Sequence, residues 1–65
     1  MTVKDIREKS NNELLKDIAS LKEELFTLRF QKATGQATSF SRMKEIRKTI
    51  ARIKTVMTER ELGTN

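Results

Sequence analysis

Lysine and arginine side chains are concentrated in one stretch of this chain, residues 42–54. This stretch contains six bases and a single acid, Glu45, so it has a net charge of +5, equal to that of the whole chain. The six bases are Arg42, Lys44, Arg47, Lys48, Arg52 and Lys54. Basic side chains at this density can neutralise the phosphates of a polyanion.

The ordinary explanation for such residues is a solvated helix face. An excess of cations without balancing acids is costly through self-repulsion, however, and it favours a polyanionic partner. Nucleic acid is the first candidate, and an anionic membrane surface is the second. We expect mainly phosphate and sugar contacts. Base stacking is expected to be minor, because the chain has no Tyr, Trp or His and its three Phe residues are expected mostly in packing.

The residue types used in common enzyme chemistry are missing. The chain has no cysteine and no histidine, which removes thiol nucleophiles, the usual zinc ligands and the usual neutral-pH base. The acid pairs Glu23–Glu24 and Glu59–Glu61 are better explained as charge balance on a basic helix. Gly35 stands alone, so there is no glycine-rich phosphate loop. We predict a protein that is not an enzyme, with no metal, no cofactor and no small-molecule substrate.

Apolar residues recur at steps of three and four, which is typical of one face of an α-helix. One set lies within the basic stretch and just beyond it: Met43, Ile46, Ile50, Ile53 and Met57. The other set comes earlier: Leu14, Ile18, Leu21, Leu25 and Leu28. With Ser10 as N-cap, the first helix is expected at about 11–33. Gly35 favours a loop at about 34–39, and Thr38 or Ser39 can cap a second helix at about 40–61.

The two apolar stripes match one another in reverse order. From Leu28 with Met43 to Leu14 with Met57, the residue numbers in each pair have the same sum. This is the register of two antiparallel helices joined by a short loop. We therefore predict an all-α fold, an antiparallel two-helix hairpin that forms a single domain over residues 1–65.

A short helical turn is expected before the first long helix. Thr2 and Asp5 have the spacing of a capping box, which predicts an N-terminal turn with Val3 and Ile6 on one side.

A core this small is expected to leave the isolated fold marginal in stability, so that a partner surface completes it. No run approaches the roughly 18 apolar residues of a membrane span, and the matched stripes leave no spare broad apolar face on the basic helix for a membrane surface.

A second apolar strip follows the first helix, outside the paired stripe. Its members are Leu15, Ala19, Phe26 and Phe30, followed by Ala33. Two interpretations stay open. Phe26 and Phe30 can fold over the hairpin edge, against Val56 or Phe40, or the strip can be a docking face for another protein or RNA. A related alternative is a helical interaction module that self-associates into a bundle through this strip.

Two segments resemble the ribosomal protein L29 family of the large ribosomal subunit. They are Leu-Phe-Thr-Leu-Arg-Phe-Gln-Lys-Ala-Thr-Gly-Gln at residues 25–36 and Ile-Arg-Lys-Thr-Ile-Ala-Arg-Ile-Lys-Thr at residues 46–55. The N-terminal residues 6–10, followed by Glu13 and Leu14, also fit the family. The resemblance covers essentially the full chain. Phe40 departs from the polar residue expected at the entry to the second helix, and Ser41 is uncharged.

The resemblance implies a structural constituent of the large subunit that binds ribosomal RNA near the polypeptide exit tunnel and supports translation in the cytoplasm. It also implies ribosomal protein L23 as a neighbour and a position close to nascent-chain factors. The RNA-facing residues implied by the motifs are Arg29, Gln36, Arg47, Lys48, Arg52 and Lys54. Charge and position add Lys9, Lys32, Arg42 and Lys44. The strip of Leu15, Ala19, Phe26 and Phe30 is the expected protein-docking face.

Overall fold

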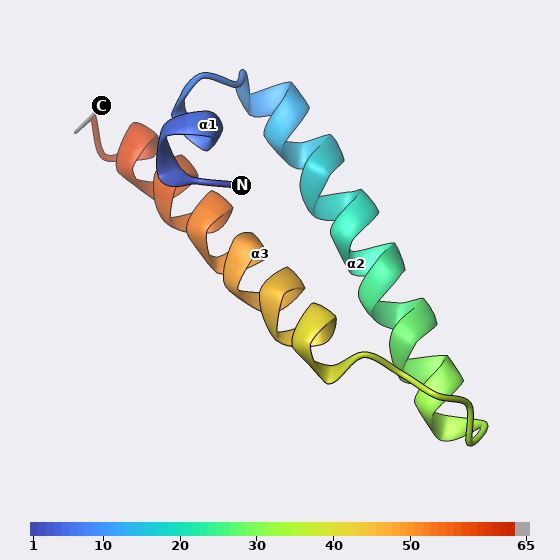
Figure 1. The fold of residues 1–65 in the computed structure, drawn as a ribbon. Coiled ribbons are helices and arrows are strands. Elements are labelled where there is room, and N and C mark those ends of the chain that lie inside the picture. Colours follow the sequence, from blue (N-terminus) through green and yellow to red (C-terminus); the bar gives the residue numbers. More distant parts are fainter. Residues whose placement is uncertain (64–65) are drawn as a thin grey trace.

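The computed structural model describes residues 1–63, which form three α-helices (Figure 1). The helices are α1 at Val3–Arg7, α2 at Asn11–Ala33 and α3 at Phe40–Glu61. α2 and α3 run antiparallel to one another, and α1 lies against α3 at the end opposite the α2–α3 loop (Figure 1). The molecule is a rod with extents of 45 × 18 × 17 Å. The predicted all-α hairpin with a short N-terminal turn is confirmed.

Local side chains fix where each helix begins. The Ser10 hydroxyl accepts a hydrogen bond from the Glu13 N–H at 3.2 Å, and the Ser39 hydroxyl accepts one from the Arg42 N–H at 3.2 Å. At α1 the Thr2 hydroxyl accepts from the Asp5 N–H, and the Asp5 carboxylate accepts from the Thr2 N–H, both at 3.2 Å. These side chains satisfy backbone donors that have no partner within the helix.

The end of α2 depends on one glycine. Gly35 has φ +81°, a left-handed conformation that L side chains rarely adopt. Its N–H donates to the Lys32 carbonyl at 3.1 Å, and the Gln36 N–H donates to the Gln31 carbonyl at 2.9 Å. This pair of bonds is a Schellman motif, which ends α2 and turns the chain toward α3.

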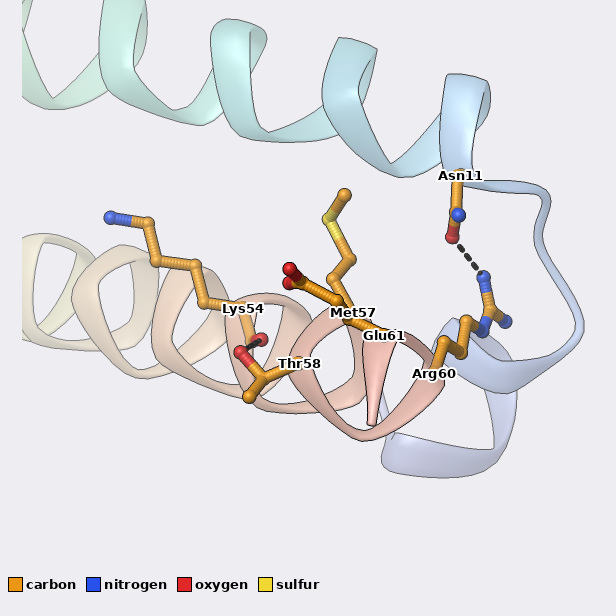
Figure 2. Close-up of a pocket in the computed structure, with 6 residues that line it drawn as sticks. All are labelled: Asn11, Lys54, Met57, Thr58, Arg60 and Glu61. Carbon is orange, nitrogen blue, oxygen red and sulfur yellow. Dashed lines mark hydrogen bonds between the residues drawn. The ribbon is translucent and has the colours of Figure 1, made fainter. Parts of the chain in front are cut away.

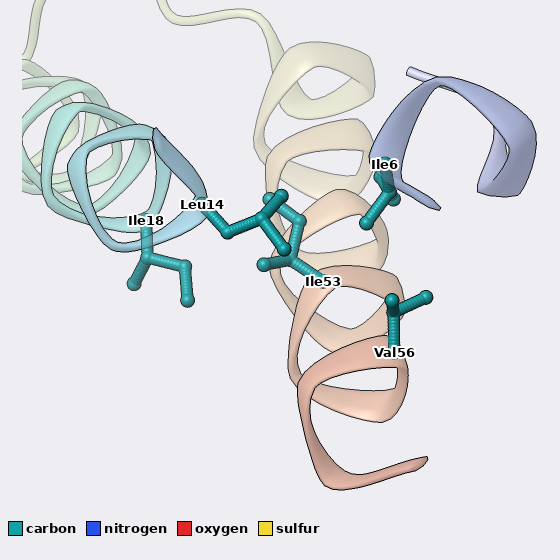
Figure 3. Packing of buried hydrophobic residues seen from close by; sticks show 5 residues of the cluster. All are labelled: Ile6, Leu14, Ile18, Ile53 and Val56. Carbon is teal, nitrogen blue, oxygen red and sulfur yellow. The ribbon is translucent and has the colours of Figure 1, made fainter. Parts of the chain in front are cut away.

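The core consists of two neighbouring apolar clusters. One brings together all three helices through Ile6, Leu14, Ile18, Ile53 and Val56. Figure 3 shows Leu14 of α2 meeting Ile53 of α3, with Ile6 of α1 close by. The other joins α2 to α3 near the loop through Leu25, Met43 and Ile46. Leu21 packs against both clusters, so the hairpin seam is continuous.

The buried face of α3 is rotated from the predicted stripe. Thr49 and Val56 are 5% and 2% exposed, whereas Ile50 and Met57 are only half-buried. Thr49 and Val56 are seven residues apart and therefore share one side of the helix. The cause at Val56 is α1, whose Ile6 is fully buried in the same cluster. Ile50 and Met57 pack against the two clusters, as predicted, but they lie along one flank of the seam.

Polar contacts from α3 hold α1 and the start of α2 at this end of the rod. Arg60 donates to the Asn11 side-chain oxygen at 2.7 Å and to the Arg7 carbonyl at 3.0 Å. The Arg7 guanidinium also lies 3.4 Å from a Glu59 carboxylate oxygen. Together with Ile6, these contacts make α1 a third packed element of the fold.

Candidate nucleic-acid interface

The bases of α3 are exposed, and their spacing divides them into two rows. Lys44, Lys48 and Arg52 follow one another at steps of four, so they form a ridge on the side of α3 away from the seam. We call these three residues the outer ridge. Arg47 and Lys54 are seven residues apart and lie on the flank that also carries Ile50 and Met57.

Arg29 of α2 joins this flank. It lines an open groove together with Arg47, and the other lining residues are Lys22, Leu25, Phe26 and Ile50. We call Arg29, Arg47 and Lys54 the groove row. Lys54 lies further along the same flank, in a second groove that Figure 2 shows with Met57 and the Arg60–Asn11 hydrogen bond. The structure therefore brings Arg29 and Arg47 together across the seam. The outer ridge ends at Arg52, which reaches the opposite flank of α3 beside α1.

Two predicted RNA contacts are engaged within the chain. The Lys9 ammonium lies 2.6 Å from an Asp17 carboxylate oxygen, and this hydrogen bond raises the pKa of Lys9. Arg42 binds both carboxylate oxygens of Glu24, one of them at 2.9 Å, and it also lies 3.0 Å from Glu45. Because of this guanidinium, the pKa of Glu24 lies below its ordinary value.

The six residues of the outer ridge and groove row differ from these. Within residues 1–63, none of the six has a carboxylate at ion-pair distance. They are Arg29, Lys44, Arg47, Lys48, Arg52 and Lys54. Their charge is available to an external anion.

The remaining predicted RNA contacts lie near the α2–α3 loop. The Lys32 ammonium lies 5.0 Å from the centre of the Phe40 ring, a cation–π contact that uses the apolar residue at the start of α3. Gln36 has an exposed side chain, and its backbone N–H is committed to the Schellman motif. An exposed amide side chain at this point can still donate to or accept from RNA.

The apolar strip on α2 is open to solvent. Phe26, Phe30 and Leu15 are 72%, 61% and 54% exposed, and Ala19 is exposed as well. The interpretation in which the two Phe rings fold over the hairpin edge was wrong, because both residues are largely exposed. Near the loop, α2 and α3 pack through Leu25, Met43 and Ile46 instead. The expectation that Phe is mostly used in packing was also wrong, since Phe40 is 58% exposed.

Sequence reasoning missed Lys22, whose side chain lines the groove with Arg29 and Arg47. Its spacing carried a signal, because Lys22 comes seven residues after Leu15 and four before Phe26, on the same side of α2. Residues 1–63 contain no cluster of three or more side chains suited to hold a metal ion. None of the three helices is long and apolar enough to cross a membrane.

Comparisons with known proteins agree on one family. The family model described as ribosomal L29 protein matches residues 4–60. A large ribosomal subunit protein uL29 from Caldanaerobacter subterraneus subsp. tengcongensis is 59% identical over 63 residues, covering 97% of this chain and 96% of the relative. Proteins of the same name from Thermoanaerobacter sp. (strain X514) and Bacillus cereus (strain B4264) are 57% and 54% identical. The first covers 97% of this chain and 91% of the relative, and the second covers 100% and 98%.

Proposed function

Because the chain belongs to the ribosomal L29 protein family, whose members are structural constituents of the large ribosomal subunit and not enzymes, we propose that it binds ribosomal RNA through α3 and the adjoining flank of α2. The supporting observation is the set of six bases on the outer ridge and groove row that lack a carboxylate partner within residues 1–63. Phosphate oxygens are the anions that such residues neutralise in RNA.

The two rows suit RNA segments that converge on the rod. The outer ridge faces away from α2, whereas the groove row lies along the seam. The two rows can therefore bind two different RNA segments. Phosphate contacts of this kind position a protein without reading base sequence. The protein thereby acts as a rigid cationic rod that neutralises the phosphates of neighbouring RNA segments and holds these segments together.

Four further predicted contacts have a secondary place in this proposal. Lys32 and Gln36 lie beside the loop and can extend the contact around the end of the rod. Lys9 and Arg42 already form ion pairs with Asp17 and Glu24. They therefore contribute less to phosphate binding, and their main role is in the fold. The order of importance is therefore set by intramolecular pairing.

The family resemblance also supports a finer location. We propose that the chain lies near the polypeptide exit tunnel, next to ribosomal protein L23 and close to nascent-chain factors. The strip of Leu15, Ala19, Phe26 and Phe30 is the proposed protein-docking face, because exposed apolar residues in a row favour a partner surface. Self-association into a bundle is disfavoured if two copies meet groove to groove, since the cationic linings of the two grooves would then lie against one another.

Reassembly of large subunits tests the RNA contact. Subunits lacking this protein are incubated with the wild-type chain or with Arg47→Gln/Lys48→Gln, and bound protein is measured after sedimentation through about 0.5 M salt. We expect the double variant to be lost at a lower salt concentration than the wild type, because it removes one base from each row. Helicity measured by circular dichroism should be unchanged, since both side chains are exposed.

The matched control is Lys4→Gln/Lys16→Gln, which removes two exposed charges outside both rows. This control should remain bound like the wild type. Equal loss of both double variants would show that net charge alone matters, and equal retention of both would contradict the assignment of Arg47 and Lys48 to RNA.

A further inference from the structure

The groove between α2 and α3 combines an apolar floor with a cationic rim. It has a volume of about 430 Å³, with Leu25 and Ile50 forming its apolar lining beside the Phe26 ring. Lys22, Arg29 and Arg47 complete the lining, to which no acidic residue among residues 1–63 contributes. Within residues 1–63, none of these three bases forms an ion pair.

Phe26 gives this groove its chemical character. Phe26 is 72% exposed, more than Phe30 or Phe40, although the apolar Leu25 and Ile50 line the same groove. An exposed aromatic ring flanked by arginines is the combination on which unpaired bases stack in RNA-binding proteins. Phe26 is the one member of the proposed protein-docking strip that lines the groove, so a nucleotide at Phe26 leaves Leu15, Ala19 and Phe30 to a protein partner.

Charge decides between the occupants that an apolar groove could take. A second copy of this chain that met the groove through its own groove would place like charges against one another, which is unfavourable. A protein segment would need both an apolar anchor and several carboxylates to match the rim. A nucleotide carries an apolar ring face and adjacent phosphates in one unit, so it satisfies the floor and the rim together.

We propose that this groove is a subsite for one unpaired RNA nucleotide, whose base packs on Phe26 while the neighbouring phosphates pair with Arg29 and Arg47. The proposal rests on the RNA-binding function above, and it adds a contact to a base where that function requires only phosphates. Lys22 completes the rim on the α2 side. The same geometry predicts that a splayed-out nucleotide, and not a continuous duplex, enters the groove.

Two probes separate the base contact from the phosphate contacts. One is a single-stranded oligoadenylate of about 12 nucleotides, and the other is an abasic ribose-phosphate oligomer with the same number of phosphates. The affinity of the full chain for each is measured by fluorescence anisotropy at equal salt. The wild type should prefer the oligoadenylate by about 5-fold or more, since stacking of one base is worth at least about 1 kcal/mol.

Phe26→Leu keeps an apolar residue in place but removes the aromatic face. It should abolish most of the preference for oligoadenylate and leave the affinity for the abasic oligomer unchanged. Phe30→Leu is the matched control, because it removes an exposed ring that lies outside the groove, and it should keep the wild-type preference. Since both rings are largely exposed, helicity should be retained in both variants, as circular dichroism can verify.

A second readout uses the absence of tryptophan from the chain. Phe26→Trp introduces a single fluorophore in the groove, and we expect oligoadenylate to quench its emission more than the abasic oligomer does. Phe30→Trp should show little difference between the two probes. Equal quenching of both variants by oligoadenylate would overturn the assignment of the base to Phe26.

The outcomes distinguish the subsite from the function on which it rests. Failure of the wild type to bind either probe would count against RNA binding itself. Equal affinity for both probes would leave phosphate binding in place and overturn the nucleotide subsite. A third probe, an acidic peptide that alternates glutamate and leucine, tests for a protein occupant. Tighter binding of this peptide than of oligoadenylate, lost in Phe26→Leu, would assign the groove to a protein partner instead.

Discussion

At the level of single residues, the ion pair between Arg42 and Glu24 links α3 to α2 near the loop. The hydrogen bond from Arg42 lowers the pKa of Glu24 below its ordinary value of 4.5. A carboxyl group with a lowered pKa in the folded state contributes stability above its unfolded pKa, and this contribution is lost as the pH falls through the folded pKa. The Arg42–Glu24 pair therefore makes the fold sensitive to acid.

Replacement of Glu24 should reduce this sensitivity. We expect the urea midpoint of the wild type to fall more steeply than that of Glu24→Gln between about pH 6 and about pH 3. Asp5 also has a lowered pKa, because its carboxylate accepts the Thr2 N–H, so every variant keeps some acid dependence. Urea titrations followed by circular dichroism give the comparison.

The neighbouring carboxylate supplies the control for this measurement. Glu23 forms no ion pair within residues 1–63, so Glu23→Gln should follow the wild-type curve. If Glu23→Gln and Glu24→Gln show the same reduced slope, the acid dependence comes from net charge and not from the Arg42 pair.

Helix caps were predictable from the sequence, whereas ion pairs were not. Ser10 and Thr2 act on N–H groups three residues away, so their roles are visible in the local pattern. Glu24 and Arg42 are separated by 18 residues, and their contact depends on how the two helices are rotated about their axes. For the same reason the sequence did not separate the paired bases from the unpaired ones.

At the level of elements, α1 is short but buries one complete side chain. Ile6 is 0% exposed and shares its cluster with residues of both long helices. Removal of its outer carbons in Ile6→Ala should lower the free energy of unfolding by about 2–5 kcal/mol, the range for large-to-small changes in a core. Because a chain of this length has a small core, we expect a large drop in the thermal midpoint.

Val3 is the matched position on the same helix. Its side chain is 41% exposed, so Val3→Ala should change the free energy of unfolding by less than about 0.5 kcal/mol. Thermal unfolding monitored at the helix signal provides both values. Similar small effects for both variants would mean that α1 does not contribute to the stability of the hairpin.

The two long helices were predictable because their apolar periodicity and caps agree. The rotation of α3 was not predictable in the same way. Hydropathy favoured Ile50 and Met57 over Thr49 as buried residues, but burial follows the position of a residue on the helix. In addition, α1 covers a side of α3 that would be exposed in a hairpin of two helices. A capping box at Thr2 indicated the extra turn, yet nothing in its spacing showed that Ile6 would pack beside Val56.

At the level of the whole molecule, the rod exposes two basic rows and one apolar strip. Which bases face outward followed from their positions relative to the apolar stripe, because the helix period fixes both. The groove could not be predicted, since it is formed by Lys22, Phe26 and Arg29 from α2 and Arg47 from α3. Its lining depends on the distance and rotation between helices, which the stripes alone do not determine.

The two rows together predict how RNA binding responds to salt. If all six unpaired bases neutralise phosphates, the logarithm of the affinity should fall with the logarithm of the salt concentration at a slope of about −4 to −5, given roughly 0.7–0.9 per contact. Arg47→Gln/Lys48→Gln should make the slope shallower by about 1.5, whereas Phe26→Leu should reduce the affinity for unpaired RNA without changing the slope. Anisotropy titrations of the labelled protein with large-subunit ribosomal RNA between about 50 and 300 mM salt measure both quantities. A slope that stays unchanged in the double variant would mean that Arg47 and Lys48 face solvent or protein, because a base that releases no counterion does not contact a phosphate.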